Sequence, residues 1–122
     1  MGWVKIGEGL NALSSGGAEV EGTLKEIRYS SDPLDLCEGE APQNLVVLLK
    51  TAGVTIITPI LSMIKGIICT NGGTSSHLAI ISREYRIPCI MATRLNRHDN
   101  LDGKEVKIQL RRKKGYVYLL EA

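Results

Sequence analysis

Two short segments, 44–49 and 67–70, each contain an unbroken run of apolar residues, and they constrain the fold of this chain most. A strand with one face in water alternates apolar and polar residues, whereas an unbroken apolar run is typical of a strand covered on both faces. The covering layers must consist mainly of Val, Ile, Leu and Ala, because aromatic residues make up 4% of the chain and Phe is absent. A chain of 122 residues fits one domain, which we assign to residues 1–122.

Other segments show the alternation expected of strands. Residues 18–29 alternate with a change of phase, which predicts a β-bulge near residues 25–26. Residues 104–110 and 116–120 are predicted to pair as a hairpin. A short strand is also expected at 89–92.

Two segments carry helix-start signals. The dipeptide Thr58-Pro59 combines a capping side chain with the backbone angle preferred at the first helical position, and it predicts a short helix that ends at Gly66. A second helix is predicted to start from a cap at Ser75 or Ser76 and to run to about Tyr85.

Charge and cysteine content argue against several classes of function. The net charge of +2 is too small to indicate a nucleic-acid or membrane partner, and the basic run at 111–114 is better explained as a solvated hairpin turn. No apolar run approaches the length of a membrane span, and residues 1–10 lack the apolar stretch of a signal peptide. Cys37, Cys69 and Cys89 show no C-x-x-C spacing, so we expect reduced thiols, no bound metal and a cytoplasmic protein.

The stretch that most suggests chemistry is Gly72-Gly73-Thr74-Ser75-Ser76-His77, between a buried strand and a helix. Paired glycines allow a tight turn whose N–H groups face one concavity, and we expect Gly73 to need an unusual backbone conformation. The helix start adds unpartnered N–H groups and a dipole that favours an anion, while the hydroxyls are further donors. The candidate phosphate-binding residues are Gly72, Gly73, Thr74, Ser75 and Ser76, and the candidate catalytic residue is His77.

These residues also have ordinary structural explanations. A Gly-Gly turn followed by serines is a common helix cap, and a single histidine is more often structural than catalytic. A zinc site is disfavoured because no other metal-binding side chain lies near His77 at ligand spacing, and a serine hydrolase is disfavoured because G-x-S-x-G is absent. The residue pattern alone therefore leaves a structural cap and a phosphoryl site both open.

A family resemblance adds to this pattern. Residues 67–91 read IICTNGGTSSHLAIISREYRIPCIM. This resembles the phosphohistidine swivelling domain of phosphoenolpyruvate-utilising enzymes, which include pyruvate phosphate dikinase, phosphoenolpyruvate synthase, Enzyme I of the sugar phosphotransferase system and rifampin phosphotransferase. Their pattern is a buried strand, G-G-x-T-S-H, small and apolar residues, Arg, often Glu, and later I-P-x-apolar; here Ser75 replaces the usual Thr. The strand around Gly22 and the segments 101–106 and 115–118 resemble the early, late and closing segments of that family.

The resemblance implies an α/β fold, a single compact swivelling β/β/α domain. It also implies a phosphotransferase component that accepts a phosphoryl group on His77 and passes it to an acceptor elsewhere. The implied partners are an ATP-grasp-like nucleotide-binding domain, a phosphoenolpyruvate- or pyruvate-binding domain, or both, in separate chains or in one longer enzyme. ATP or phosphoenolpyruvate, with magnesium, is then expected on those partners and no cofactor on this domain, so the isolated chain is expected to be an incomplete enzyme.

The alternative is a non-catalytic interaction or regulatory module that keeps the fold. Its signature would be loss of His77 or of the glycine turn, and both are retained. Arg83 belongs to the family pattern but lies six residues after His77, on a different helix face, where an ion pair or a helix contact is expected. His98 lies in a polar run and is expected to be a solvated loop residue.

Overall fold

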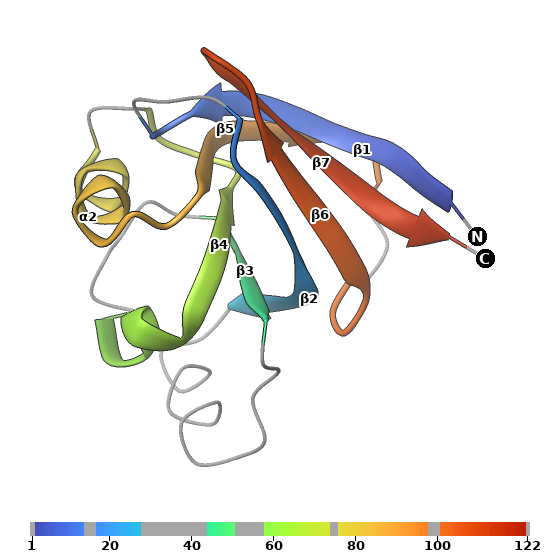
Figure 1. Ribbon diagram of the computed structural model, residues 1–122, viewed down its shortest axis with the longest axis horizontal. Helices are drawn as coiled ribbons and strands as arrows, with labels where there is room; N and C mark the ends of the chain where they lie inside the picture. Colours follow the sequence, from blue (N-terminus) through green and yellow to red (C-terminus); the bar gives the residue numbers. More distant parts are fainter. Residues whose placement is uncertain are drawn as a thin grey trace.

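The strands close into a barrel. The computed structural model describes residues 2–13, 17–27, 44–50, 58–73, 76–97 and 101–121. The elements in chain order are β1 (Gly2–Asn11), β2 (Glu19–Ile27), β3 (Leu45–Leu49), the 3-10 helix η1 (Thr58–Met63), β4 (Ile64–Cys69), α2 (His77–Tyr85), β5 (Cys89–Leu95), β6 (Glu105–Leu110) and β7 (Lys114–Glu121). The strand order is β1-β5-β4-β3-β2-β6-β7, in which β2, β3, β4 and β5 are parallel neighbours and the other pairs are antiparallel (Figure 1). The expected class holds in a coarser form, a sheet-rich fold with one α-helix in the described residues.

One hydrophobic cluster fills the inside of the barrel, and we call it the interior cluster. Every strand contributes to it, as expected for side chains that point toward the barrel axis. Its fully enclosed members come from alternate positions of the strands, such as Val46 and Leu48 on β3. The interior cluster consists of Ile6, Leu24, Val46, Leu48, Ile68, Ile90, Leu101, Val106, Ile108, Leu110, Val117 and Leu119.

A second hydrophobic cluster, the outer cluster, lies between the parallel strands and the two helices. Its strand members include Leu45, Val47 and Leu49, the residues of β3 that alternate with those of the interior cluster. The helices contribute Ile60 and Leu61 from η1, and Leu78 and Ala79 from α2. Both faces of β3 are therefore covered, which confirms the interpretation of its unbroken apolar run.

The phase change in β2 comes from the same two layers and not from a bulge. Leu24 packs in the interior cluster, whereas Ile27 packs in the outer cluster. The pairings of β2 with β3 and β6 run without a register shift, so the bulge predicted near residues 25–26 is wrong. A strand that passes between two apolar layers can bury side chains of either phase.

The helix predicted from Thr58-Pro59 to Gly66 is wrong in its length and type. The segment is a 3-10 helix that ends at Met63, and β4 starts at Ile64. Gly66 lies within β4, where an added Cβ would come 2.8 Å from Cδ1 of Ile108. Close packing against the barrel interior, rather than helix termination, accounts for this glycine.

The first strand, β1, was not anticipated from the sequence. It closes the barrel between β5 and β7, with a register shift in each pairing. An added Cβ at Gly9 would lie 2.5 Å from the backbone oxygen of Met91, so β1 can approach β5 this closely only with glycine there. Gly7, where an added Cβ would lie 2.9 Å from the Arg94 backbone oxygen, and Gly9 are thus required by the neighbouring strand β5.

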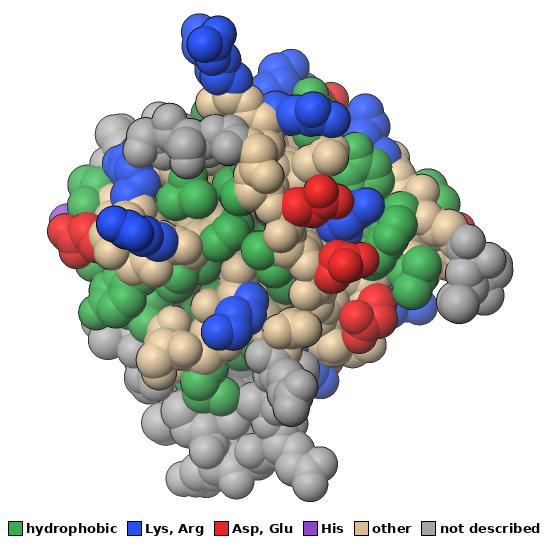
Figure 2. All heavy atoms as spheres, in the orientation of Figure 1, with side chains coloured by type: hydrophobic (Ala, Val, Ile, Leu, Met, Phe, Trp, Pro, Cys, Tyr) green, Lys and Arg blue, Asp and Glu red, His purple; other side chains and the backbone are tan. Residues whose placement is uncertain are grey.

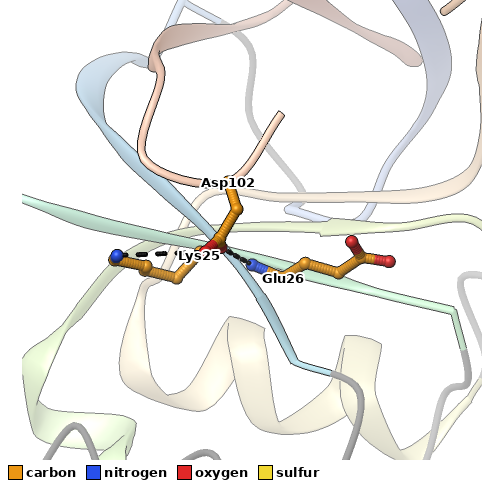
Figure 3. Close-up of polar contacts among 3 residues, drawn as sticks. All are labelled: Lys25, Glu26 and Asp102. Atoms are coloured by element: carbon orange, nitrogen blue, oxygen red, sulfur yellow. Dashed lines mark hydrogen bonds and ion pairs between the residues drawn. The ribbon is translucent and has the colours of Figure 1, made fainter. Parts of the chain in front are cut away.

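The antiparallel side ends in two turns. The predicted β6–β7 hairpin is confirmed, and its basic turn at 111–114 is exposed; Figure 2 shows Lys and Arg side chains gathered at the upper end of this face. Before β6, Asp102 accepts a hydrogen bond from the backbone N–H of Glu26 (2.8 Å) and pairs with Lys25, whose Nζ lies 4.0 Å from Oδ2 (Figure 3). Leu101 is buried in the interior cluster, so this turn fastens the end of the barrel.

Candidate functional site

The candidate site lies where the chain leaves β4 and enters α2. The exit is held to the neighbouring strand, because the Thr70 N–H donates to the Leu49 carbonyl oxygen at 2.9 Å. Helix α2 lies outside the barrel, beside β4 and β5 (Figure 1). It is fixed there by Leu78, Ala79 and Ser82, which are buried. The sequence prediction of a buried strand, a turn and a helix is confirmed.

Ser76 is the N-cap of α2, which resolves the choice between Ser75 and Ser76. Its backbone is extended, with φ −69° and ψ 160°, and its Oγ accepts a hydrogen bond from the Ala79 N–H at 3.4 Å. The Ile80 N–H donates to the Ser76 carbonyl oxygen at 3.1 Å and starts the helical ladder. Because Oγ serves the cap as an acceptor, the Ser76 hydroxyl proton is still available to a ligand.

His77 is the first residue of α2, and its side chain is exposed. Histidine surface is visible at the edge of the molecule over α2 in Figure 2. The N–H groups of His77 and Leu78 belong to the first turn, where a helix offers them no acceptor of its own. An exposed imidazole thus lies at the positive end of the helix, where the first-turn N–H groups have no acceptor within the helix itself.

The glycine of the turn that has a left-handed backbone is Gly72 and not Gly73. Gly72 has a left-handed backbone, with φ 78°, whereas the φ of Gly73 lies outside the left-handed region. The expectation that Gly73 needs the unusual conformation is therefore wrong. An Asn side chain can bond to the nearby backbone of a turn, and here Asn71 Oδ1 accepts the Gly72 N–H at 2.8 Å, so that donor is engaged within the turn.

Several residues of the prediction lie outside the described part of the chain. They are Thr74 and Ser75 of the candidate phosphate-binding set, together with His98 and Cys37. Their assignments remain predictions. Of the candidate set, the structure places Gly72, Gly73, Ser76 and His77 on one short connection from β4 to α2.

Arg83 contacts the body of the domain. Its Nη1 donates to the Ala12 carbonyl oxygen at 3.3 Å, just beyond the end of β1. This bond fastens α2 to the segment after β1, and the ion pair or helix contact expected of Arg83 stays a prediction. At the end of α2, Arg86 adopts φ 55° and its N–H returns to the Arg83 and Ser82 carbonyl oxygens, which closes the helix.

The two described cysteines form no disulfide, and both are buried in the outer cluster. Burial raises the pKa of Cys69 above its ordinary value of 9.0, and a hydrogen bond to the Asn71 backbone opposes this. Burial likewise raises the pKa of Cys89 to about 12, against a smaller effect of the Ser82 hydroxyl. Both residues are core thiols, as their apolar surroundings in the sequence predict.

The described residues also bear on metals and membranes. Among them, no three His, Cys, Asp or Glu side chains come close enough together to hold a metal ion. In the same part of the chain, neither helix has the length and apolar character needed to cross a bilayer.

Comparison with known proteins decides the family. Residues 43–113, more than half of the chain, match the family described as PEP-utilising enzyme, mobile domain. The chain belongs to this family. The match includes β3, β4, α2, β5 and β6, so it covers the turn and the helix that carry His77.

One curated relative places this mobile domain in a longer protein. The chain is 30% identical over 108 residues to chondramide synthase cmdD from Chondromyces crocatus. The match covers 88% of this chain and 3% of that synthase, so the mobile domain spans a small fraction of the relative's length.

The sequence did not indicate a role in the site for Asn71 or Cys69, whose hydrogen bonds shape the turn. For Asn71, the available signal was an Asn before Gly at the end of a buried strand.

Proposed function

We propose that this mobile domain carries a phosphoryl group on His77 between two sites on other domains or chains. The observation that carries the proposal is the exposed imidazole at the first residue of α2, at the positive end of that helix, in a chain of this family. A carrier needs a nucleophile that partner sites can reach, together with donors for the phosphoryl oxygens. The swivelling β/β/α arrangement belongs to the same proposal and is supported by the outer cluster under α2.

The proposed chemistry is two successive displacements at phosphorus. A ring nitrogen of His77 attacks the donor phosphorus, a P–N bond forms, and the P–O bond to the leaving group breaks. In the second step an acceptor oxygen attacks the same phosphorus and the P–N bond breaks. The first-turn N–H groups and the Ser76 hydroxyl would stabilise the charge on the phosphoryl oxygens in both steps. Gly72, Gly73, Thr74 and Ser75 complete the proposed phosphate-binding set.

The donor and acceptor sites are proposed to lie on partners. A nucleotide-binding domain of the ATP-grasp type, a phosphoenolpyruvate- or pyruvate-binding domain, or both would hold ATP or phosphoenolpyruvate with magnesium. The family membership and the small share of the matched synthase that this chain covers support such partners. We propose that this domain binds no cofactor itself and acts in the cytoplasm, in line with its free thiols.

The test is to map the phosphorylated residue. The chain is incubated with a panel of candidate partner domains and labelled ATP or phosphoenolpyruvate, and the label is located by mass spectrometry under alkaline conditions. We expect label on His77, none without a partner, and a loss of at least about a thousandfold in His77→Ala. His98→Ala is the matched control and should accept label at the wild-type rate. Label retained by His77→Ala would refute the carrier function, and a failure of every partner to label the wild type would favour the non-catalytic module.

A further inference from the structure

The exit of β4 is tied down by a buried thiol. Cys69, the last residue of β4, is fully buried, and its Sγ donates to the main-chain oxygen of Asn71 at 3.0 Å. The side-chain oxygen of Asn71 in turn accepts the N–H of Gly72, the residue with the left-handed backbone. The two bonds engage the carbonyl oxygen and the N–H of the same peptide group, which joins Asn71 to Gly72, and so they fix its orientation.

We propose that Cys69 is a positioning residue for phosphoryl transfer, because its thiol sets the path of the chain from β4 to His77. The proposal rests on the proposed function of His77 and adds a residue that the function itself does not require. Cys69 lies inside the outer cluster and does not contact the phosphoryl group. It acts through Asn71 and Gly72.

The connection is short enough to transmit the orientation of the turn. Only residues 70–76 separate Cys69 from His77, and both ends of this segment are anchored. At the start, Thr70 is bonded to β3; toward the end, the Ser76 N–H donates to the Gly73 carbonyl oxygen at 3.1 Å. In this proposal, a change in the direction of the Asn71 carbonyl shifts Gly72 and Gly73, and the bond from Ser76 to Gly73 passes the shift to the cap of α2.

The protonation state of the thiol suits this role. Burial raises the pKa of Cys69, so near neutral pH the side chain is S–H, a donor, and not a thiolate. A thiol is a weak donor, so we expect little effect of its loss on the stability of the fold. Transfer is more sensitive, since a misplacement of about 1 Å can slow a reaction by about a hundredfold.

Cys89 provides a matched control within the same cluster. It is as buried as Cys69 and lies on the adjacent strand β5, but its sulfur contacts Met91 Sδ, 3.5 Å away, and the Ser82 hydroxyl of α2. Replacing either cysteine by alanine removes one buried sulfur from the outer cluster. Only the change at Cys69 removes a hydrogen bond to the turn.

The experiment compares Cys69→Ala, Cys69→Ser and Cys89→Ala with the wild type. The rate of label transfer to His77 is measured at saturating partner, and the turn is observed independently by NMR as the amide shift and hydrogen exchange of Gly72. We expect Cys69→Ala to slow transfer about tenfold and to speed the hydrogen exchange of the Gly72 amide. Cys69→Ser should recover most of the transfer rate, because its hydroxyl can replace the thiol as a donor. Cys89→Ala should match the wild type in both transfer rate and Gly72 exchange. Melting temperatures should fall by similar amounts in both alanine variants.

Two results would overturn the inference. Equal losses of transfer in Cys69→Ala and Cys89→Ala would mean that the cluster, and not the thiol bond, matters. An unchanged Gly72 amide in Cys69→Ala would remove the proposed link to the turn, whatever the transfer rate. Failure of the proposed function is recognised separately, because then the wild type itself takes no label on His77.

Discussion

The interior and outer clusters are of similar size but differ in what they contain and touch. The interior cluster holds only hydrocarbon side chains, drawn from all the strands of the barrel. The strand members of the outer cluster come from the four parallel neighbours; the cluster includes both described thiols and is covered by α2 and η1. The exit of β4 and the start of α2, where the candidate site lies, border the outer cluster.

This difference separates stability from chemistry. The interior cluster is enclosed by a continuous ladder of backbone pairs, so its contribution is to hold the barrel closed. The outer cluster is closed by one short helix, which at the same time presents His77. Loss of one of the helix side chains that seat α2 should therefore alter transfer, whereas changes inside the barrel should alter only the fraction of folded protein.

The largest expected effect tests that separation directly. Ile108→Ala in the interior cluster and Leu78→Ala beneath α2 should each lower the free energy of unfolding by about 2–5 kcal/mol, because both side chains are fully buried. At a temperature where both variants are folded, Ile108→Ala should transfer at the wild-type rate and Leu78→Ala should transfer more slowly. Urea unfolding and label transfer measure the two quantities. Equal transfer rates in the two variants would erase the distinction between the clusters.

The second effect concerns the cap of α2. Ser76→Ala removes the acceptor for the Ala79 N–H and a hydroxyl donor near His77. The free energy of unfolding should fall by about 1 kcal/mol. Transfer should fall by about a hundredfold, because a donor lost from a charge-stabilising site affects the rate more than the fold. Ser76→Thr, which keeps the hydroxyl, is the control; an equally slow Thr variant would contradict the role of this donor.

A third effect belongs to the outer cluster and depends on pH. In the folded chain the pKa of Cys89 is about 12, against an ordinary value of 9.0. Between these values the unfolded chain has lost the thiol proton while the folded chain keeps it, so stability is full below about pH 9 and falls as the pH rises. The slope approaches, at most, about 1.4 kcal/mol per pH unit.

The measurement is urea unfolding from pH 8 to pH 10.5 on the wild type and Cys89→Ala. The difference in free energy of unfolding between the two should shrink as the pH rises above about 9. Lys65→Ala, an exposed change on β4, is the control and should track the wild type. A difference that stays constant over this range would mean that the buried thiol does not titrate as described.

The smallest effect compares the two glycines of the turn. Gly72 has φ 78°, so Gly72→Ala should lower the free energy of unfolding by about 1 kcal/mol. An added Cβ at Gly73 meets no atom within 4 Å, so Gly73→Ala should leave the stability unchanged within about 0.5 kcal/mol. Thermal unfolding of both variants measures the difference. A larger loss of unfolding free energy in Gly73→Ala than in Gly72→Ala would mean that Gly73 is the residue whose backbone requires glycine.

Local signals made much of the site predictable. A serine cap predicts the start of α2, and the predicted end near Tyr85 agrees with the last residue of the helix. Both signals lie within a few residues of the helix itself. The hairpin of β6 and β7 follows from alternation around a basic turn. His77 was placed at the helix start by the same local signals, and the family pattern agrees with them.

The errors arose where distant partners set the structure. Gly9 and Gly66 look like breaks in the sequence, but each accommodates a neighbour on another strand, which no local pattern shows. The change of phase in β2 reflects two apolar layers rather than a bulge. The turn is a different case, because the Gly72 N–H donates to the adjacent Asn71 side chain, and Asn before Gly was a local signal for it.

The pairing of β1 with β7 has a mechanical consequence. Gly2 is paired with Glu121, so the two ends of the described chain lie side by side (Figure 1). Tension applied between those ends would pull β1 and β7 apart one pair at a time, as a zip opens, and would not load all their hydrogen bonds together. Tethers fixed to both ends would hold the barrel at a single point on its rim, so the whole body could turn about that point while its strands stay paired.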